Sequence, residues 1–134
     1  MSLDTELQKA ISAVPECLAA GYVDLTSGML IGIKTVDSHP SEVMDFLAAA
    51  TSDLFQGPNV VSIENAFKKA RGTEADKRHY FREVIVLSEN LVHVFMRSKT
   101  NGEHVAGFVC RKSVNLGMAL TKARSAMEGL EAAA

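Results

Sequence analysis

The sequence has 134 residues, of which 47% are apolar and 22% are charged, and its formal net charge is −2. This length and composition predict one soluble globular domain over residues 1–134. The charge gives no basic surface of the kind that nucleic-acid binding requires, so we expect no nucleic-acid partner.

The apolar runs give no sign of membrane insertion. Asp4 and Glu6 stand where a secretory signal would be basic, and no run reaches the roughly 18 apolar residues of a spanning helix. We therefore expect a cytoplasmic protein. Cys17 and Cys110 lie outside any C-x-x-C pattern, so we expect both to be reduced, with no zinc or redox motif.

The first half of the chain alternates between helical and strand patterns. Helical spacing over 3–14 is followed by two strand-like runs, 17–25 and 29–36. Gly28 ends the turn between these runs, where a positive φ is needed. An apolar stripe at helical spacing then covers 43–54, and a second helical piece starts at Asn59 and ends at Gly72.

The second half predicts three strands, 80–88, 90–98 and 104–112, and a closing helix that starts after an N-cap at Asn115. Asn101-Gly102 predicts a two-residue type I′ turn between the last two strands. The fold class is therefore α+β: a single five-stranded antiparallel sheet flanked by helices, in the order α-β-β-α-(α)-β-β-β-α.

A two-residue turn at Asn101-Gly102 sets a register in which His93 lies opposite Cys110, with Phe95 opposite Phe108. The His-Cys pair would be a nucleophile and its base, or a half-buried histidine beside a buried structural cysteine. We favour the structural alternative because the sequence offers neither a third orienting residue nor an oxyanion loop.

Other catalytic patterns are missing from the sequence. Asp24 has no second aspartate in a comparable loop, no histidine pair has metal-ligand spacing, and no glycine-rich phosphate loop occurs. We therefore expect no enzyme activity, no catalytic or cofactor-binding residues, no metal and no cofactor.

The strand 80–88 carries apolar residues on both faces, with Val84 and Val86 on one and Ile85 and Leu87 on the other. Two explanations remain open: helices cover both faces of the sheet, or this strand is an edge that pairs with a partner.

The order of elements resembles the roadblock/dynein light-chain family, which has a profilin-like fold. The first hairpin matches the family's valine-aspartate pair, glycine turn and apolar strand through Val23, Asp24, Gly28, Met29, Leu30 and Ile31. The closing helix matches through Asn115, Gly117, Ala119, Lys122 and Arg124. Residues 58–78 depart from the family, because they form a longer connection between the second helix and the third strand.

The resemblance implies the strand order second, first, fifth, fourth, third, which would place Cys17 and Cys110 on adjacent strands. It also implies a homodimer formed by the second helix and third strand, whose interface would include Phe46, Ala49, Ala50, Val84 and Val86. Bacterial relatives of this type regulate small Ras-like GTPases, and others act as adaptors.

Two functions are consistent with these patterns. The first is a non-enzymatic dimeric regulator or adaptor that modulates a small Ras-like GTPase. The alternative is a ligand-binding sensor of PAS or GAF type, in which residues 58–78 would close an apolar pocket between sheet and helix.

Overall fold

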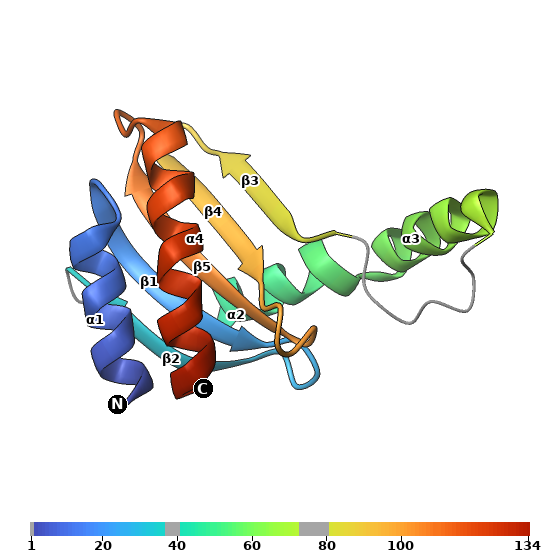
Figure 1. The fold of residues 1–134 in the computed structure, drawn as a ribbon, viewed down its shortest axis with the longest axis horizontal. Coiled ribbons are helices and arrows are strands. Elements are labelled where there is room, and N and C mark those ends of the chain that lie inside the picture. Colours follow the sequence, from blue (N-terminus) through green and yellow to red (C-terminus); the bar gives the residue numbers. More distant parts are fainter. Residues whose placement is uncertain (1, 37–40, 73–80) are drawn as a thin grey trace.

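The computed structural model describes residues 2–36, 41–72 and 81–134, with the side chains of 41–48 excepted. Its elements follow the expected order (Figure 1). They are α1 (Leu3–Ala13), β1 (Cys17–Asp24), β2 (Met29–Thr35), α2 (Ser41–Gln56), α3 (Pro58–Arg71), β3 (Glu83–Leu87), β4 (Leu91–Arg97), β5 (His104–Arg111) and α4 (Leu116–Ala133).

The five strands form one antiparallel sheet in the order β2-β1-β5-β4-β3. The predicted fold class is therefore confirmed, as is the strand order that the roadblock resemblance implies. β2 and β3 are the two edge strands, because each pairs with only one strand among the described residues.

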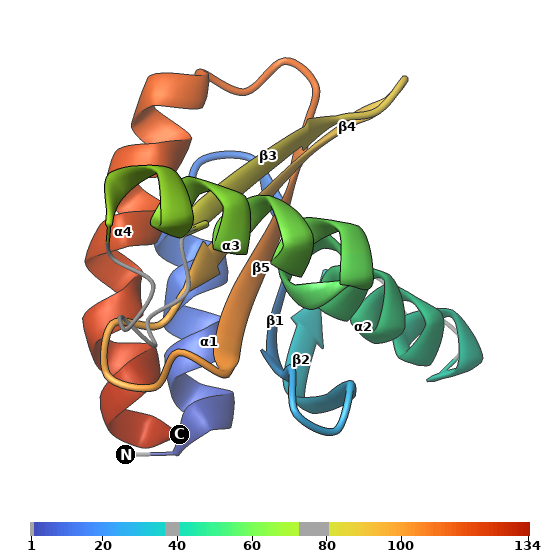
Figure 2. The ribbon, with the colours of Figure 1, turned by 90° about the vertical axis from the view of Figure 1, so that its right-hand side faces the viewer.

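Helices cover the two faces of the sheet unequally. α1 and α4 lie side by side on one face, where α1 contacts β1, β2 and α4 (Figures 1 and 2). α2 lies on the opposite face against β1 and β2. The helices at the ends of the chain thus form one layer, and α2 covers only part of the other face.

The larger core lies between the sheet and the α1–α4 layer. Its buried members are Leu7, Ala10, Val14, Cys17, Ala20, Tyr22, Val92, Val94, Met96, Ala106, Phe108, Cys110, Val114, Ala119, Ala123, Met127 and Leu130. A smaller core, formed by Val23, Leu25, Phe55 and Val105, lies under α2. Strand residues alternate between these two cores, as the period of two predicts.

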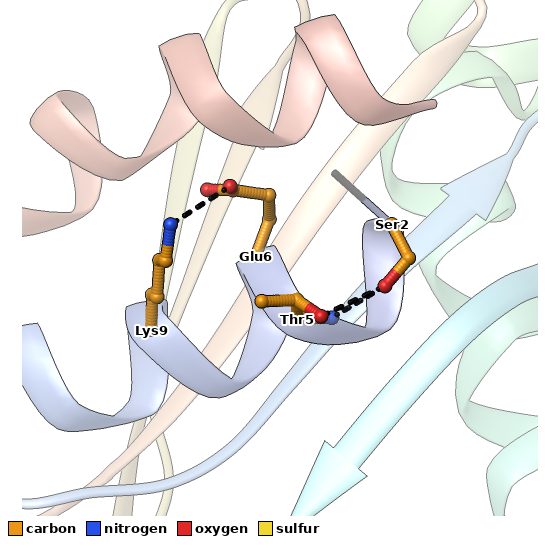
Figure 3. A network of polar contacts seen from close by, with 4 residues as sticks. All are labelled: Ser2, Thr5, Glu6 and Lys9. Atoms are coloured by element: carbon orange, nitrogen blue, oxygen red, sulfur yellow. Dashed lines mark hydrogen bonds and ion pairs between the residues drawn. The ribbon is translucent and has the colours of Figure 1, made fainter.

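Local polar contacts fix the start of α1 (Figure 3). Ser2 caps the helix because its Oγ accepts the Thr5 backbone N–H at 3.1 Å. Glu6 is 8% exposed, and its carboxylate pairs with Lys9 Nζ at 3.3 Å. A Cβ atom at Gly129 of α4 would meet this carboxylate, so the glycine lets α1 and α4 approach closely.

Both glycine-terminated segments form as expected. Gly28 has φ +71° at the end of the first hairpin turn. Gly72, also at φ +71°, ends α3, and its N–H donates to the carbonyls of Lys68 and Lys69. Asn115 caps α4, with its Oδ1 accepting the Met118 N–H at 3.0 Å.

The type I′ turn predicted at Asn101-Gly102 is wrong. Neither residue has positive φ, and the connection runs over residues 99–103, between a paired Ser98 and His104. Ser98 Oγ accepts the N–H groups of Thr100 (3.2 Å) and Asn101 (3.1 Å). These side-chain hydrogen bonds support a longer loop than the Asn-Gly pair alone would form.

Candidate interaction surface

The longer β4–β5 loop moves the strand register by one residue. His93 lies opposite Val109, and Cys110 lies opposite Val92. Phe95 lies opposite Gly107 instead of Phe108. A shift of one residue places side chains on opposite faces, so His93 and Cys110 do not meet and the candidate nucleophile–base pair is wrong.

His93 has a structural environment on the α2 face. Its ring stacks on Phe95 with centroids 6.3 Å apart, and its Nε2 lies 3.3 Å from Ser88 Oγ. Burial lowers the pKa of His93, because the charged ring is disfavoured away from water.

Asp24 also has a structural role. Its Oδ1 accepts the Thr26 N–H at 3.1 Å, its Oδ2 accepts the Ser27 hydroxyl at 3.2 Å, and its backbone carbonyl accepts the Gly28 N–H at 2.8 Å. All of these contacts shape the turn before β2. The acid and hydroxyl groups of this stretch therefore stabilise a hairpin turn.

No group of three or more His, Cys, Asp or Glu side chains within the described ranges could hold a metal ion. Among the helices described, none has both the length and the apolar character needed to cross a membrane. An open hollow of about 540 Å³ lies beside α1, with Asp4, Gln8, Lys9 and Lys34 among its lining residues. None of its lining residues belongs to 58–78, so this hollow is not the pocket that the sensor alternative expects those residues to close.

The outer edge of β3 pairs with no other strand among the described residues, and it carries apolar side chains. On the face that carries α4, Ile85 is 40% exposed and Leu87 is 65% exposed. Val84 and Val86 are half-buried on the α2 face, beside Phe95 and His93. No proline, bulge or charge protects the run from Val84 to Leu87, although edge strands usually carry such protection.

The predicted interface residues of α2 are only partly within the described structure. Ala49 and Ala50 are exposed, which leaves their small side chains accessible to a partner. The side chain of Phe46 lies outside the described part of the structure. The interface of Phe46, Ala49, Ala50, Val84 and Val86 therefore stays a prediction.

α3 is turned away from the sheet. Figure 1 shows it extending beyond β3, and Figure 2 shows it crossing in front of the β3 edge. Its apolar residues recur at helical spacing and form the α3 stripe, defined as Val60, Ile63, Phe67 and Ala70. Ile63 is 46% exposed and Phe67 is 47% exposed.

All 14 residues of α3 are described, and Glu64 is the only one that is buried. An amphipathic helix normally buries its apolar face, and a helix of this length gains most of its stability from such packing. The α3 stripe is therefore a candidate contact surface. Its periodicity was visible in the sequence, but its outward direction was not.

Two buried charged side chains, Arg97 and Glu64, lie where β4, α2 and α3 come together. Arg97, at the end of β4, is 3% exposed, and its Nη2 donates to the carbonyl of Phe55 near the end of α2 at 3.0 Å. Its guanidinium lies 5.2 Å from the centre of the Phe55 ring. Glu64 is also 3% exposed and accepts the Phe81 N–H at 3.3 Å.

Opposing effects act on the Arg97 guanidinium. Burial lowers its pKa, while the charges of Glu64 and Glu103 raise it. Its Nε and Nη1 have no hydrogen-bond partner within the described residues. Because a buried guanidinium remains protonated, the negative charge of Glu64 offsets part of the positive charge of Arg97. The sequence analysis did not identify this pair of buried charges, because Arg97 and Glu64 are 33 positions apart in the sequence.

Cys17 and Cys110 lie on the adjacent strands β1 and β5, as the implied strand order predicts, and the structure also places them directly opposite each other. Both are buried free thiols. A hydrogen bond from Cys110 lowers the pKa of Cys17, whereas the same contact and burial raise the pKa of Cys110. Their redox state stays a prediction.

Comparison with known proteins relates this fold to solved structures. No family model matches the sequence, and no match was found among curated proteins. The gliding protein MglB of Thermus thermophilus aligns with a TM-score of 0.70 and 17% identity, over 97% of this chain and 86% of that chain. A roadblock/LC7 domain from Streptomyces avermitilis aligns with a TM-score of 0.70 and 13% identity, over 98% and 97%.

MglC of Myxococcus xanthus aligns with a TM-score of 0.59 and 19% identity, over 98% of both chains. One further structure, with a TM-score of 0.70 and 17% identity over 97% of this chain and 85% of that chain, is of MglB in a tetrameric arrangement. These similarities extend over nearly the whole chain, and this chain has the roadblock/LC7 fold.

Proposed function

We propose that this chain is a non-enzymatic homodimeric regulator or adaptor that acts on a small Ras-like GTPase in the cytoplasm. The observation that carries the proposal is the open apolar edge of β3, with the outward-facing α3 stripe beside it. The shared roadblock fold and the resemblance in the first hairpin and closing helix support the partner class.

A second copy of the chain fits this edge by symmetry. Pairing of two β3 edges across a two-fold axis would supply hydrogen-bond partners for both strands and extend the sheet to ten strands, as the roadblock resemblance implies. Each α3, which lies outside its own β3 edge, would then lie against the partner. This arrangement would bury the α3 stripe, Ile85 and Leu87.

The oligomeric state tests the dimer directly. We expect light scattering at micromolar concentration to give the mass of a dimer, and a monomer would contradict the proposal. Ile63→Glu places a charge in the α3 stripe and should weaken dimerisation at least about tenfold, because a buried unpaired charge costs more than about 1.4 kcal/mol.

Asn65→Glu is the matched control, because Asn65 is exposed and lies two positions along the same helix, away from the stripe. It adds the same charge and should leave the dimer intact. Equal effects of the two substitutions would show that α3 takes no specific part in the interface, while the β3 pairing could still hold.

The GTPase partner requires a separate test. We expect the tagged protein to retain a small GTPase from extracts of its native host, and to change that GTPase's rate of GTP hydrolysis in a purified mixture. The Ile63→Glu variant should lose this effect if the dimer is the active form. Recovery of no GTPase would contradict the partner, and it would leave the dimer untouched.

A further inference from the structure

The Cys17–Cys110 pair has no role in the proposed dimer, and it lies in the larger core between β1 and β5. We propose that these two thiols form an intramolecular disulfide when the protein meets a peroxide, which joins the first strand of the chain to the last. This inference is independent of the proposed function.

The backbone geometry suits a disulfide. The two residues are Cα partners in the antiparallel β1–β5 pairing, at its end and next to a register shift between Cys17 and Ala19. Directly opposed residues in such pairs have Cα atoms about 4.5–5.5 Å apart, within the roughly 4.4–6.8 Å range of disulfides. Both side chains belong to the larger core, so the two sulfur atoms lie on the same face of the sheet.

The two cysteines differ in access and in acidity. Cys17 is 7% exposed and stands at the start of β1, whereas Cys110 is completely buried. The hydrogen bond from Cys110 lowers the pKa of Cys17, which favours Cys17 as the thiolate. A second hydrogen bond, from the Cys17 thiol to the Ala19 carbonyl at 3.2 Å, belongs to the protonated form and is lost on ionisation.

The reaction proceeds in two steps. The Cys17 thiolate attacks one oxygen of hydrogen peroxide, an S–O bond forms, the O–O bond breaks, and the released hydroxide takes up a proton to leave as water. The Cys110 sulfur then attacks the Cys17 sulfenic acid, and the displaced hydroxide leaves as water with the Cys110 proton. Two thiols and one peroxide therefore give one disulfide and two waters; both sulfurs are oxidised and the peroxide is reduced.

Mass spectrometry tests the proposal. After peroxide treatment, denaturation and alkylation without reductant, we expect the intact chain to be lighter by two hydrogens and to carry no alkyl group. Digestion should give a single linked pair of peptides containing Cys17 and Cys110, and dithiothreitol should restore two alkylatable thiols. Oxidation should also raise the midpoint of thermal unfolding, because the new bond restricts the unfolded chain.

Single serine variants separate the two steps. Cys110→Ser should stop at a Cys17 sulfenic acid that dimedone traps, and Cys17→Ser should leave Cys110 alkylatable. Two free thiols in treated wild-type protein, conversion to sulfinic acid, or a disulfide between two chains would each overturn the proposal. The wild-type result decides the matter even if a variant fails to fold.

Discussion

Gly28 shows how a single residue determines the first hairpin. Its φ of +71° belongs to the left-handed region, and no atom lies within 4 Å of the position that a Cβ would occupy. The restriction on this position therefore comes from its own backbone conformation and not from neighbouring side chains. Such local requirements are the kind that a sequence predicts well.

We expect Gly28→Val to lower the free energy of unfolding by about 1–3 kcal/mol, because a β-branched residue tolerates positive φ poorly. Gly28→Asn is the control, since asparagine adopts the left-handed region more readily and should cost less. Urea unfolding of both variants measures the difference. Equal stability of the valine variant and the wild type would show that the turn relaxes to another conformation.

His93 shows why a neighbouring prediction failed. The register of β4 and β5 depends on the length of their loop, and that length depends on the Ser98 hydroxyl, which accepts two backbone N–H groups. The Asn-Gly pair alone favours a two-residue turn. A register shift of one residue turns every side chain of a strand to the other face of the sheet. An error of this size in the expected loop therefore made the His93–Cys110 prediction wrong.

At the scale of the elements, β3 is tied to α4 by an ion pair. The Arg124 guanidinium donates two hydrogen bonds to the Glu83 carboxylate, one from Nε at 2.9 Å and one from Nη2 at 2.8 Å. These hydrogen bonds to Arg124 hold the pKa of Glu83 below its ordinary value. The remaining β3 residues, Val84 to Leu87, are all apolar.

The stability that this pair contributes should depend on pH. Because the pKa of Glu83 is depressed in the folded state, the contribution is present above the usual glutamate pKa of about 4.3 and is lost as the pH falls through the folded value. We expect Glu83→Gln to be less stable than wild type near pH 7, and the difference to shrink in acid.

Urea unfolding at one protein concentration, at neutral and acid pH, checks this expectation. Arg124→Gln removes the same ion pair and should show the same pH dependence, while the double variant should lose little more than either single one. A difference between wild type and Glu83→Gln that stays constant across the pH range would contradict the role of the pair.

For the whole molecule, the sequence predicts the order of the elements but not the direction of α3. Periods of 3.6 and 2 are local properties, so the helices and strands could be assigned from the residues themselves. The direction of α3 is a tertiary property, and the buried contacts near its start, Arg97 with Phe55 and Glu64 with Phe81, join segments distant in the sequence. The sequence analysis considered residues 58–78 only as a possible lid, and within them α3 extends beyond β3 (Figure 1).

In the proposed dimer, thermal stability should depend on protein concentration. If α3 and β3 are buried between two copies, a tenfold rise in concentration stabilises the dimer by about 1.4 kcal/mol. For a unit of two such chains this corresponds to a rise in Tm of about 2–3 °C per tenfold change.

Calorimetry over two decades of concentration measures this slope. Ile63→Glu should flatten it, because the separated chains no longer gain from mass action, and Asn65→Glu should keep it. A wild-type Tm that does not change with concentration would contradict a dimer that dissociates on unfolding. A slope that survives in Ile63→Glu would place the interface on β3 and α2 without α3.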